Sequence, residues 1–322
     1  MHALVLAHGT LQFTPDHPQP IPGDGEALIR VLRAGICNTD LELVQGYQNF
    51  AGVPGHEFVG VVEQCQIQQW LGQRVAGEIN IACGACRSCR AGMPTHCRQR
   101  CVLGIHARDG AFASYLTLPI ENLHPVPEGI SDSEAVFVEP LAACFEMLEQ
   151  VQIRPTAQIL VLGDGKMGLL AGQVLRLTGA SVTLQGKHPE KLALAERLGL
   201  QTRLGTPAQP EREFDFVVEC TGSAAGLELA RQLVRPRGTI ILKSTVAGQS
   251  TLNLAPFVVD ELTVVGSRCG PFAPALEALK DRRVIVAPLL SATYPLQGGV
   301  EAFAHAARPG TLKVQLAMTR QS

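Results

Sequence analysis

The sequence lacks the features that mark several protein classes. No uninterrupted apolar run in its 322 residues approaches the ~18–20 residues that a membrane-spanning helix requires. The first residues, Met-His-Ala-Leu-Val-Leu-Ala-His-Gly, have no basic region before their short apolar run, so we expect a strand and not a signal peptide. The net charge of −2 provides no basic footprint for nucleic acid. We therefore expect a cytoplasmic protein with neither membranes nor nucleic acid as partners.

Internal repeats, low-complexity segments and long linkers are also missing. The length allows two domains of ordinary size, each with its own core. Apolar residues make up 46% of the chain, and 32 Gly and 21 Pro interrupt them, which is typical of a compact protein with many turns.

Four of the ten cysteines fall within fifteen residues, in the pattern C-x2-C-x2-C-x7-C. A disulfide framework would be unusual in a chain this large without a secretory signal, so we interpret the cluster as a metal site. Four sulfur ligands close a tetrahedral zinc site and leave no room for substrate, which indicates a structural role. An iron–sulfur cluster is the main alternative. The residues are Cys83, Cys86, Cys89 and Cys97.

A second candidate metal site lies in the stretch that runs from Cys37 to Glu57. It contains a cysteine (Cys37), a hydroxyl two residues later (Thr39), a histidine (His56) and an adjacent carboxylate (Glu57). A catalytic zinc takes three protein ligands of these types and keeps its fourth position open. By itself this set is weak evidence, because a Cys and a His 19 residues apart occur by chance in many chains.

The first part of the chain, up to about residue 130, reads as a barrel-like β domain. Short aliphatic runs bounded by Gly and Pro predict its strands, and the segment between Cys37 and His56 reads as a loop held over them. The last strand-like run, Leu312-Lys-Val-Gln-Leu-Ala-Met, is expected to return to this domain. A helical stretch from Glu134 to Gln150 contains Val138-Glu139-Pro140-Leu141, where Glu139 reads as solvent-facing from the residues alone.

From Gln158 onward the pattern changes to alternating strands and helices. The strand Gln158-Ile-Leu-Val-Leu precedes Gly163-Asp-Gly165-Lys166-Met167-Gly168 and then a helix through Leu177. In that context G-x-G-x-x-G indicates a dinucleotide site, with the pyrophosphate at the helix N-terminus. Later strands follow at Ser181-Val-Thr-Leu-Gln, Phe214-Asp-Phe-Val-Val-Glu, Gly238-Thr-Ile-Ile-Leu and Leu262-Thr-Val-Val-Gly. The alternation predicts a doubly wound parallel sheet.

Taken together, these motifs resemble the zinc-dependent medium-chain dehydrogenase/reductase family of alcohol, polyol and glucose dehydrogenases. The resemblance covers essentially the whole chain. It implies an α/β protein with a GroES-like β-barrel catalytic domain (residues 1–143 and 270–322, structural zinc lobe 83–97) and a Rossmann coenzyme domain (144–269). The motifs are Gly-Ile-Cys37-Asn-Thr39-Asp40, Gly55-His56-Glu57-x-x-Gly60, the four-cysteine cluster, Val138-Glu139-Pro140-Leu141, and the turn Gly163 to Gly168.

The resemblance also implies roles for single residues. Cys37 and His56 would bind a catalytic zinc, with Glu57 or Glu139 as the third ligand; Asp40 would orient His56, and Thr39 would receive the substrate proton. Cys144 lies out of register and is expected only to pack. The coenzyme residues would be Gly163, Gly165, Lys166, Met167, Gly168, Gly186, Lys187, His188, Cys220 and Thr221.

The implied reaction transfers hydride between an alcohol and a nicotinamide cofactor, with two zinc ions per chain. Family members specific for NAD carry an acidic residue after the second coenzyme strand. No Asp or Glu occurs between Gly165 and Glu190, and the strand ends in Gly186-Lys187-His188. A cation there suits the 2′-phosphate of NADP(H), which we predict over NAD(H). The segment from Leu200 to Phe214 is short and polar, so we expect a trimmed coenzyme domain.

Other functions remain open at this stage. A zinc-stabilised binding or regulatory protein could keep the dehydrogenase fold without catalysis, although it would need none of Cys37, Thr39, His56, Glu57 and Glu139. A zinc-ribbon nucleic-acid module conflicts with the charge balance, and zinc-free quinone reductases lack both cysteine features. The loop from Gly46 to Phe50 offers Tyr47, Gln48 and Asn49 as hydrogen-bonding groups, which favours a polyol or sugar over a simple alkanol. The family resemblance suggests a homodimer or homotetramer.

Overall fold

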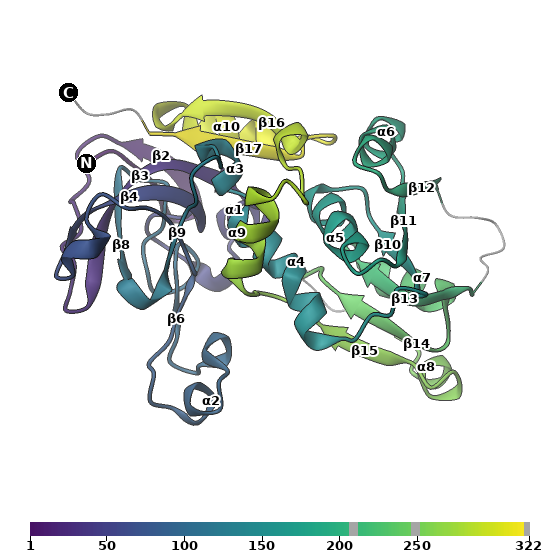
Figure 1. Ribbon diagram of the computed structural model, residues 1–322. Coiled ribbons are helices and arrows are strands. Elements are labelled where there is room, and N and C mark those ends of the chain that lie inside the picture. The colour runs from purple at the N-terminus through teal and green to yellow at the C-terminus, as the bar shows by residue number, and fades with distance from the viewer. Residues whose placement is uncertain (206–211, 246–251, 319–322) are drawn as a thin grey trace. The chain divides into compact units, whose positions relative to one another are not determined.

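The computed structural model of the protein describes residues 1–205, 212–245 and 252–318 (Figure 1). The chain divides into two compact units, Met1–Glu139 with Leu289–Ser322 and Pro140–Pro288. The first unit is built on mostly antiparallel strands, whereas the second holds a parallel sheet with connecting helices. This confirms the predicted α/β class. No helix in the described parts of the chain has both the length and the apolarity needed to cross a bilayer.

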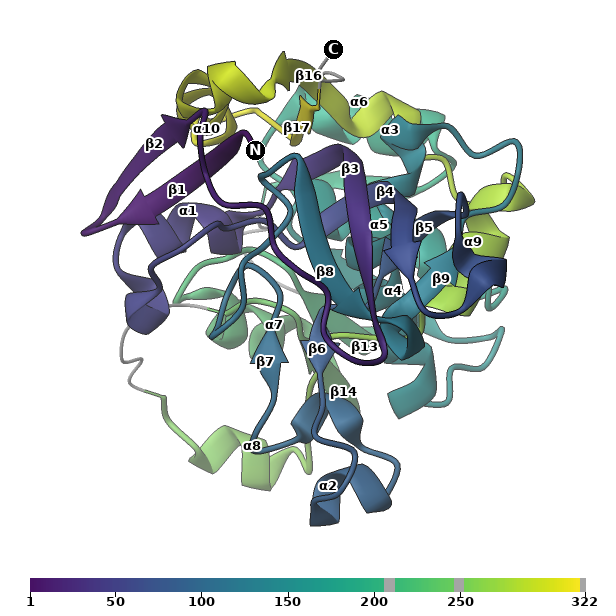
Figure 2. The same cartoon turned by 90° about the vertical axis from the view of Figure 1, so that its left-hand side faces the viewer.

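The main sheet of the first unit has seven strands, in the order β16–β17–β3–β4–β5–β9, with β8 also paired to β3. Neighbours are antiparallel except β16 and β17. Figure 2 shows β3, β4, β5 and β8 side by side in front of the viewer. The strands are β3 (Glu26–Ile36), β4 (Glu57–Cys65), β5 (Arg74–Gly77), β8 (Tyr115–Pro119), β9 (Leu123–Pro125), β16 (Leu290–Pro295) and β17 (Lys313–Ala317), and β1 (Ala3–Ala7) and β2 (Thr10–Thr14) form a separate hairpin.

The last strand returns to the first unit, as its sequence predicts. β17 pairs antiparallel with β3, with Val314 opposite Ile36. Four of its five residues are buried, among them the polar Lys313 and Gln315. The pairing brings Lys313 next to the end of β3. The last residue of β3, Ile36, directly precedes Cys37.

The segment between Cys37 and His56 is partly helical, which corrects the loop that we expect from its glycines. A short helix, α1 (Asn38–Val44), begins directly after Cys37, and a 3-10 turn, η1 (Tyr47–Asn49), follows. Asp40 explains the early start, because its Oδ2 accepts a hydrogen bond from the backbone N–H of Cys37 at 2.7 Å. A short polar side chain that binds the first amides of a helix favours helix initiation. The glycines come later, at the end of this helix and beyond.

The cysteine cluster lies in a small lobe that projects from the first unit (Figures 1 and 2). Two short paired strands, β6 (Asn80–Ile81) and β7 (Cys101–Val102), carry the chain out and back. Between them lie a one-turn helix, α2 (Arg87–Arg90), and a 3-10 turn, η3 (Pro94–His96). The rest of the unit includes three helices, α3 (Asp132–Ala135), the start of α4 (Val138–Gln150) and α10 (Gly299–Ala306).

The second unit holds a six-stranded parallel sheet in the order β12–β11–β10–β13–β14–β15. This is the predicted doubly wound arrangement, in which the strand order reverses beside the first strand. Its core is aliphatic, with Leu160, Val217 and Ile240 fully buried. The strands are β10 (Gln158–Leu162), β11 (Ser181–Gly186), β12 (Gln201–Leu204), β13 (Phe214–Glu219), β14 (Val234–Leu242) and β15 (Thr263–Gly266), and the helices are α5 (Lys166–Arg176), α6 (Pro189–Arg197), α7 (Gly226–Leu233), α8 (Ala255–Val259) and α9 (Phe272–Lys280).

One segment differs from its expected domain, and another lies partly outside the described residues. We expect residues 270–288 in the catalytic domain. They belong to the second unit. One reason is that Gln173 on α5 makes two hydrogen bonds with the backbone of Ile285, at 3.1 and 2.8 Å. The segment from Leu200 to Phe214 contains the strand β12, and its residues 206–211 lie outside the described residues.

Candidate active site and metal centres

The structure brings Cys37, His56 and Glu57 together in the first unit. Their ligand atoms lie within 4.8 Å of one another, with Cys37 half-buried and the other two buried. Cys37 follows β3, and Glu57 begins β4, the neighbouring strand, where it pairs with Gly35. Strand pairing therefore closes the 19-residue gap that makes this set weak evidence in the sequence.

Asp40 lies beside His56 and is itself fully buried. Its Oδ1 is 3.4 Å from His56 Nδ1, which is longer than a good hydrogen bond, and both atoms lack another partner. Burial lowers the pKa of His56, but the Asp40 carboxylate, assisted by the Cys37 sulfur, outweighs it and raises that pKa well above its usual range. Asp40 therefore lies beside the ring nitrogen through which the resemblance implies that it orients His56.

Glu57 forms a buried ion pair that sequence reasoning missed. Its Oε2 contacts the ammonium group of Lys313, and both side chains are almost completely excluded from solvent. Burial opposes the charge of Lys313, but Glu57 and Cys37 raise its pKa, so the ammonium group persists. Lys313 Nζ also approaches the backbone oxygen of Ile36 at 3.5 Å and lies 5.8 Å from the ring centre of Phe137.

The orphaned atoms of this site fit a bound metal. Glu57 Oε1 is buried without a hydrogen-bond partner. A carboxylate oxygen and a thiol turned toward a buried imidazole are the donor set of a zinc ion. Glu139, at the start of α4, is half-buried and acts on the charge of Lys313, but it is not part of the group of three. From the residues alone we expect Glu139 to face solvent, but in the structure its side chain is only partly exposed.

Thr39 lies on the first turn of α1, next to the candidate zinc ligands. Its Oγ1 is 3.9 Å from Cys37 Sγ, and its side chain is half-buried. A hydroxyl in this position can exchange a proton with a molecule bound beside Cys37.

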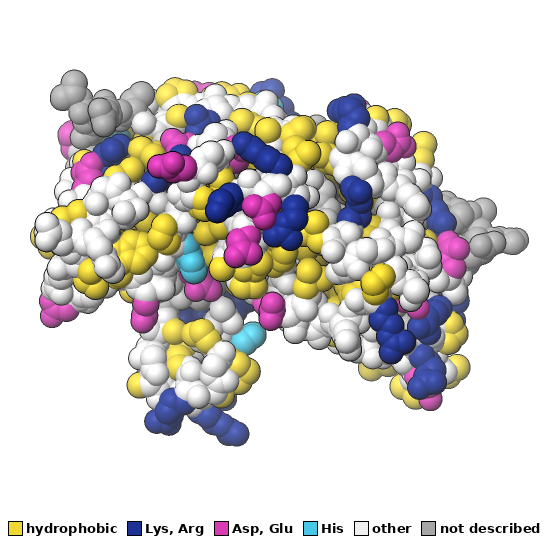
Figure 3. Space-filling view, viewed as in Figure 1, with side chains coloured by type: hydrophobic (Ala, Val, Ile, Leu, Met, Phe, Trp, Pro, Cys, Tyr) yellow, Lys and Arg dark blue, Asp and Glu magenta, His cyan; other side chains and the backbone are white. Residues whose placement is uncertain are grey.

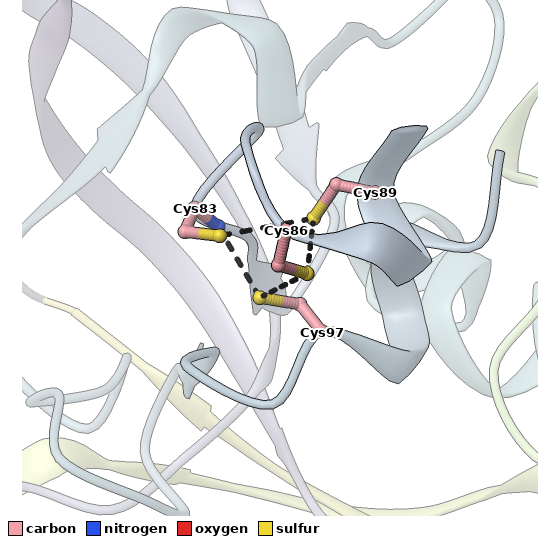
Figure 4. Close-up of side chains that lie close together, drawn as sticks. All are labelled: Cys83, Cys86, Cys89 and Cys97. Carbon is pink, nitrogen blue, oxygen red and sulfur yellow. Dashed lines mark hydrogen bonds between the residues drawn. The ribbon is translucent and has the colours of Figure 1, made fainter. Parts of the chain in front are cut away.

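The four lobe cysteines converge as their spacing predicts (Figure 4). Cys86 Sγ lies 3.4 Å from Cys89 Sγ and 3.8 Å from Cys97 Sγ. The sulfur atoms of Cys83 and Cys89 are 4.0 Å apart. The backbone amides of Cys83 and Gln99 both point at Cys97 Sγ, at 3.4 Å. A hydrogen bond with the backbone of Cys89 lowers the pKa of Cys86 to about 6, which favours a thiolate. The cluster fits a closed tetrahedral metal site.

The predicted coenzyme residues gather at the carboxyl ends of β10, β11 and β13. Gly163 has a φ of +111°, and a Cβ there would lie 2.7 Å from the backbone oxygen of Cys220. A Cβ on Gly168 would lie 1.9 Å from the Gly163 oxygen, so only glycine lets α5 approach the turn. No atom lies within 4 Å of a Cβ built on Gly165, which leaves open space at the N-terminus of α5. These glycines fit the pyrophosphate of a dinucleotide.

The other predicted coenzyme residues flank this turn. Thr221 donates its backbone N–H to Glu219 at 2.7 Å, and the amide of Cys220 bonds to Leu162 at 2.8 Å. Lys166 and Met167 begin α5; the Met167 sulfur contacts buried Cys144, which packs as expected. Gly186 ends β11, followed by exposed Lys187 and half-buried His188.

Two residues of these sites were not among our predictions. Lys313 is the first residue of the buried strand β17, and a lone charge at the start of a strand-like run is the signal that could have identified it. Asp164 occupies the variable position of the first Gly-x-Gly. It directly precedes the stretch from Gly165 to Pro189, within which no Asp or Glu occurs. Its carboxylate contacts the loop after β11.

Two models of known protein families match this chain. A family model described as "Alcohol dehydrogenase GroES-like domain" matches residues 23–128, and one described as "Zinc-binding dehydrogenase" matches residues 167–281. The D-altritol 5-dehydrogenase of Agrobacterium fabrum is 31% identical, over 98% of this chain and 99% of its own length.

Two solved structures share the fold over nearly their whole length. A zinc-binding dehydrogenase from Sinorhizobium meliloti 1021, bound to NADP, has a TM-score of 0.89 at 28% identity and covers 98% of both chains. A short chain alcohol dehydrogenase from Escherichia coli CFT073, complexed with NADH, has a TM-score of 0.90 at 25% identity and covers 98% of this chain and 99% of its own.

Proposed function

Because the chain belongs to the zinc-dependent medium-chain dehydrogenase family, we propose that it transfers hydride between a polyol or related secondary alcohol and NADP(H). The enzyme class itself, an alcohol or polyol dehydrogenase with zinc and a nicotinamide cofactor, follows from its relatives. The observation that carries the proposal is the convergence of Cys37, His56 and Glu57, in which the buried Glu57 Oε1 has no hydrogen-bond partner within the described chain.

We assign Cys37, His56 and Glu57 to a catalytic zinc, with Glu139 as the alternative third ligand. The unpartnered Glu57 Oε1 supports Glu57, because a metal would satisfy an acceptor that no protein group reaches. The Lys313 ammonium group neutralises the other carboxylate oxygen and holds it in place. Asp40 keeps the His56 ring oriented.

The chain's own residues handle the proton. When bound, zinc supplies a Lewis acid that lowers the pKa of an alcohol, and the nicotinamide supplies the hydride acceptor. Thr39 has its hydroxyl beside Cys37, and we assign to it the acceptance and onward transfer of the proton that the substrate hydroxyl loses. In the reverse direction the same hydroxyl returns a proton to the reduced carbonyl oxygen.

The NADP(H) preference is supported by the loop after β11. Exposed Lys187 and half-buried His188 follow Gly186, and the acidic residue that would bind ribose hydroxyls is missing from that strand end. The NADP-bound relative is consistent with this assignment, and the NADH-bound relative shows that the fold also accepts the other cofactor.

The polyol assignment is supported by the 46–50 loop and by one relative's substrate. Gln48 and Asn49 adopt left-handed φ values of 59° and 48°, and both are exposed. Non-glycine residues are seldom held this way, and such strain concentrates at ligand-binding positions. Two amide side chains there suit a substrate with several hydroxyl groups, as D-altritol is.

The lobe cysteines and the Cys37 group together predict two zinc ions per chain. Elemental analysis of protein purified without added metal or chelator tests this. We expect about two zinc ions for the native chain and one for Cys37→Ala, which should also lose turnover while it keeps its fold. Oxidation of alcohols by Cys37→Ala at the native rate would rule out the proposed zinc mechanism.

We also propose that the enzyme is a homodimer or homotetramer. β15 is the edge strand of the parallel sheet, and Val264 on it is 42% exposed. On α8, Val258 and Val259 are 76% and 80% exposed, and Figure 3 shows apolar side chains beside basic ones over this helix. An uncovered apolar edge strand favours pairing with another chain, so a second copy is the occupant that we assign.

A further inference from the structure

The carboxylate of Asp164 lies against the loop that follows β11. Asp164 is only 6% exposed. Its Oδ2 accepts hydrogen bonds from the backbone amides of Lys187 and His188, at 2.7 and 2.8 Å. Both carboxylate oxygens also lie 3.0 Å from His188 Nδ1. One side chain from the glycine-rich turn thus holds two successive amides and an imidazole of the next loop.

The end of β11 is shaped to admit this carboxylate. A Cβ on Gly186 would lie 2.2 Å from Asp164 Oδ2 and 2.4 Å from its Cβ, so only glycine leaves the space. Burial raises the pKa of Asp164, but the hydrogen bonds from His188 and the two amides outweigh burial and lower that pKa, which keeps the carboxylate ionised.

The contacts of Asp164 decide which groups of the loop face a ligand. Its oxygens are engaged by three N–H groups and its side chain is only 9% exposed, which leaves it little contact with ribose hydroxyls. Because His188 Nδ1 contacts Asp164 and the side chain is 43% exposed, Nε2 is the ring nitrogen that remains for a ligand. Lys187 is exposed beside it. The loop therefore presents nitrogen groups and no free carboxylate.

We propose that Asp164 is a positioning residue that fixes Lys187 and His188 against the adenosine ribose of the coenzyme and thereby sets selectivity for its 2′-phosphate. The inference rests on the NADP(H) preference proposed above. In doubly wound folds the first glycine-rich turn and the end of the second strand flank the pyrophosphate and this ribose. Asp164 connects these two elements directly.

The test uses coenzyme fragments, so it needs neither turnover nor the catalytic zinc. Binding of 2′,5′-ADP and of 5′-AMP is measured by calorimetry for the native enzyme and for Asp164→Asn. We expect the native enzyme to prefer 2′,5′-ADP, and Asp164→Asn to bind it about tenfold more weakly while its affinity for 5′-AMP falls less. Amide hydrogen exchange at Lys187 and His188 should become faster in the variant.

Two further variants separate positioning from general damage. Gly186→Ala keeps the carboxylate but displaces it, and it should reproduce the loss of preference. Asp215→Asn is the matched control, because Asp215 accepts the backbone N–H of Gln158 at 2.8 Å and the Arg235 guanidinium at 2.7 Å, where β10 begins. It should leave the affinity for both fragments unchanged.

The outcomes distinguish this inference from the proposed function. If the native enzyme prefers 2′,5′-ADP and both variants at residues 164 and 186 keep that preference, the role of Asp164 is refuted and the NADP(H) preference stands. If the native enzyme prefers 5′-AMP but Asp164→Asn binds it less tightly and exchanges faster, the NADP(H) preference is refuted and the positioning role stands. An unchanged variant of a 5′-AMP-preferring enzyme refutes both.

Discussion

Lys313 forms a buried ion pair with Glu57, one of the candidate zinc ligands. A fully buried ammonium group is costly by itself, and here it is compensated by Glu57, by a carbonyl and by an aromatic ring. The pair also leaves Glu57 with one oxygen engaged and one unpartnered, so its geometry is set before a metal binds.

Lys313→Met should destabilise the protein strongly. The substitution keeps an apolar stem of similar length but leaves the Glu57 carboxylate buried without its counter-charge. Loss of one member of a buried pair costs about 3–5 kcal/mol, which urea unfolding would measure. Lys280→Met, at the last residue of α9 on the surface, is the control and should change stability by less than about 0.5 kcal/mol. Equal stability of the two variants would contradict the role of the pair.

Thr39→Val should lower turnover while the metal content stays at the native value. Valine matches threonine in shape but has no hydroxyl, so the proposed proton transfer is lost and kcat should fall by about 10²–10⁴-fold. Thr39→Ser retains the hydroxyl and should keep most of the activity. A native rate in Thr39→Val would assign the proton to another group.

At the scale of elements, three strands of the parallel sheet are connected near their amino ends. Asp215 on β13 accepts a hydrogen bond from Gln158, the first residue of β10, and pairs with Arg235 on β14. Burial raises the pKa of Asp215, but the Gln158 amide and the Arg235 guanidinium outweigh burial and lower it.

Asp215→Asn should reduce stability in a pH-dependent way. The folded pKa of Asp215 lies below its unfolded value of about 3.9, so its stabilisation is complete above that pH and is lost as the pH falls through the folded pKa. We expect a loss of about 1–2 kcal/mol at pH 7 that shrinks below about pH 4, measured by denaturant unfolding across this range. A difference that grows on acidification would have the opposite sign and contradict the assignment.

The lobe is an element whose order we expect to depend on a bound metal. Its helix and strands are only a few residues long, so little apolar surface holds them. Cys86→Ser should therefore lose one of the two zinc ions and the order of the lobe, since zinc binding contributes most of the folding energy of such small sites. The zinc at Cys37 should remain. Loss of both metals together would show that the sites are not independent.

At the scale of the whole molecule, the proposed assembly depends on an apolar edge. Val264→Asp places a charge on β15 and should shift the oligomer toward the monomer, as measured by light scattering after size-exclusion chromatography. Val300→Asp is the matched control, because Val300 is 47% exposed on α10 in the first unit. If Val264→Asp leaves the native mass unchanged, β15 is not the contact.

The sequence by itself determined the fold class, the cysteine cluster and the glycine-rich turn. Each of these depends on spacing within a short segment: Cys83 to Cys97 form one cluster of converging sulfur atoms, and Gly163 to Gly168 connect one strand to one helix. Local spacing restricts local geometry, so such features can be read without the fold. The helix after Cys37 was not predicted from the sequence. The glycines of this segment indicate a loop, but Asp40 binds the Cys37 amide and favours helix initiation before them.

Only the tertiary structure decided how distant residues combine. Lys313 meets Glu57 across 256 residues because β17 and β4 both pair with β3, and Asp164 meets His188 because β10 and β11 are parallel neighbours. Strand pairing sets these contacts, and no short segment of sequence encodes it. The loop after β11 contains no acidic residue of its own. Asp164 from the neighbouring glycine-rich turn contacts this loop, and its carboxylate holds the amides of Lys187 and His188 in place.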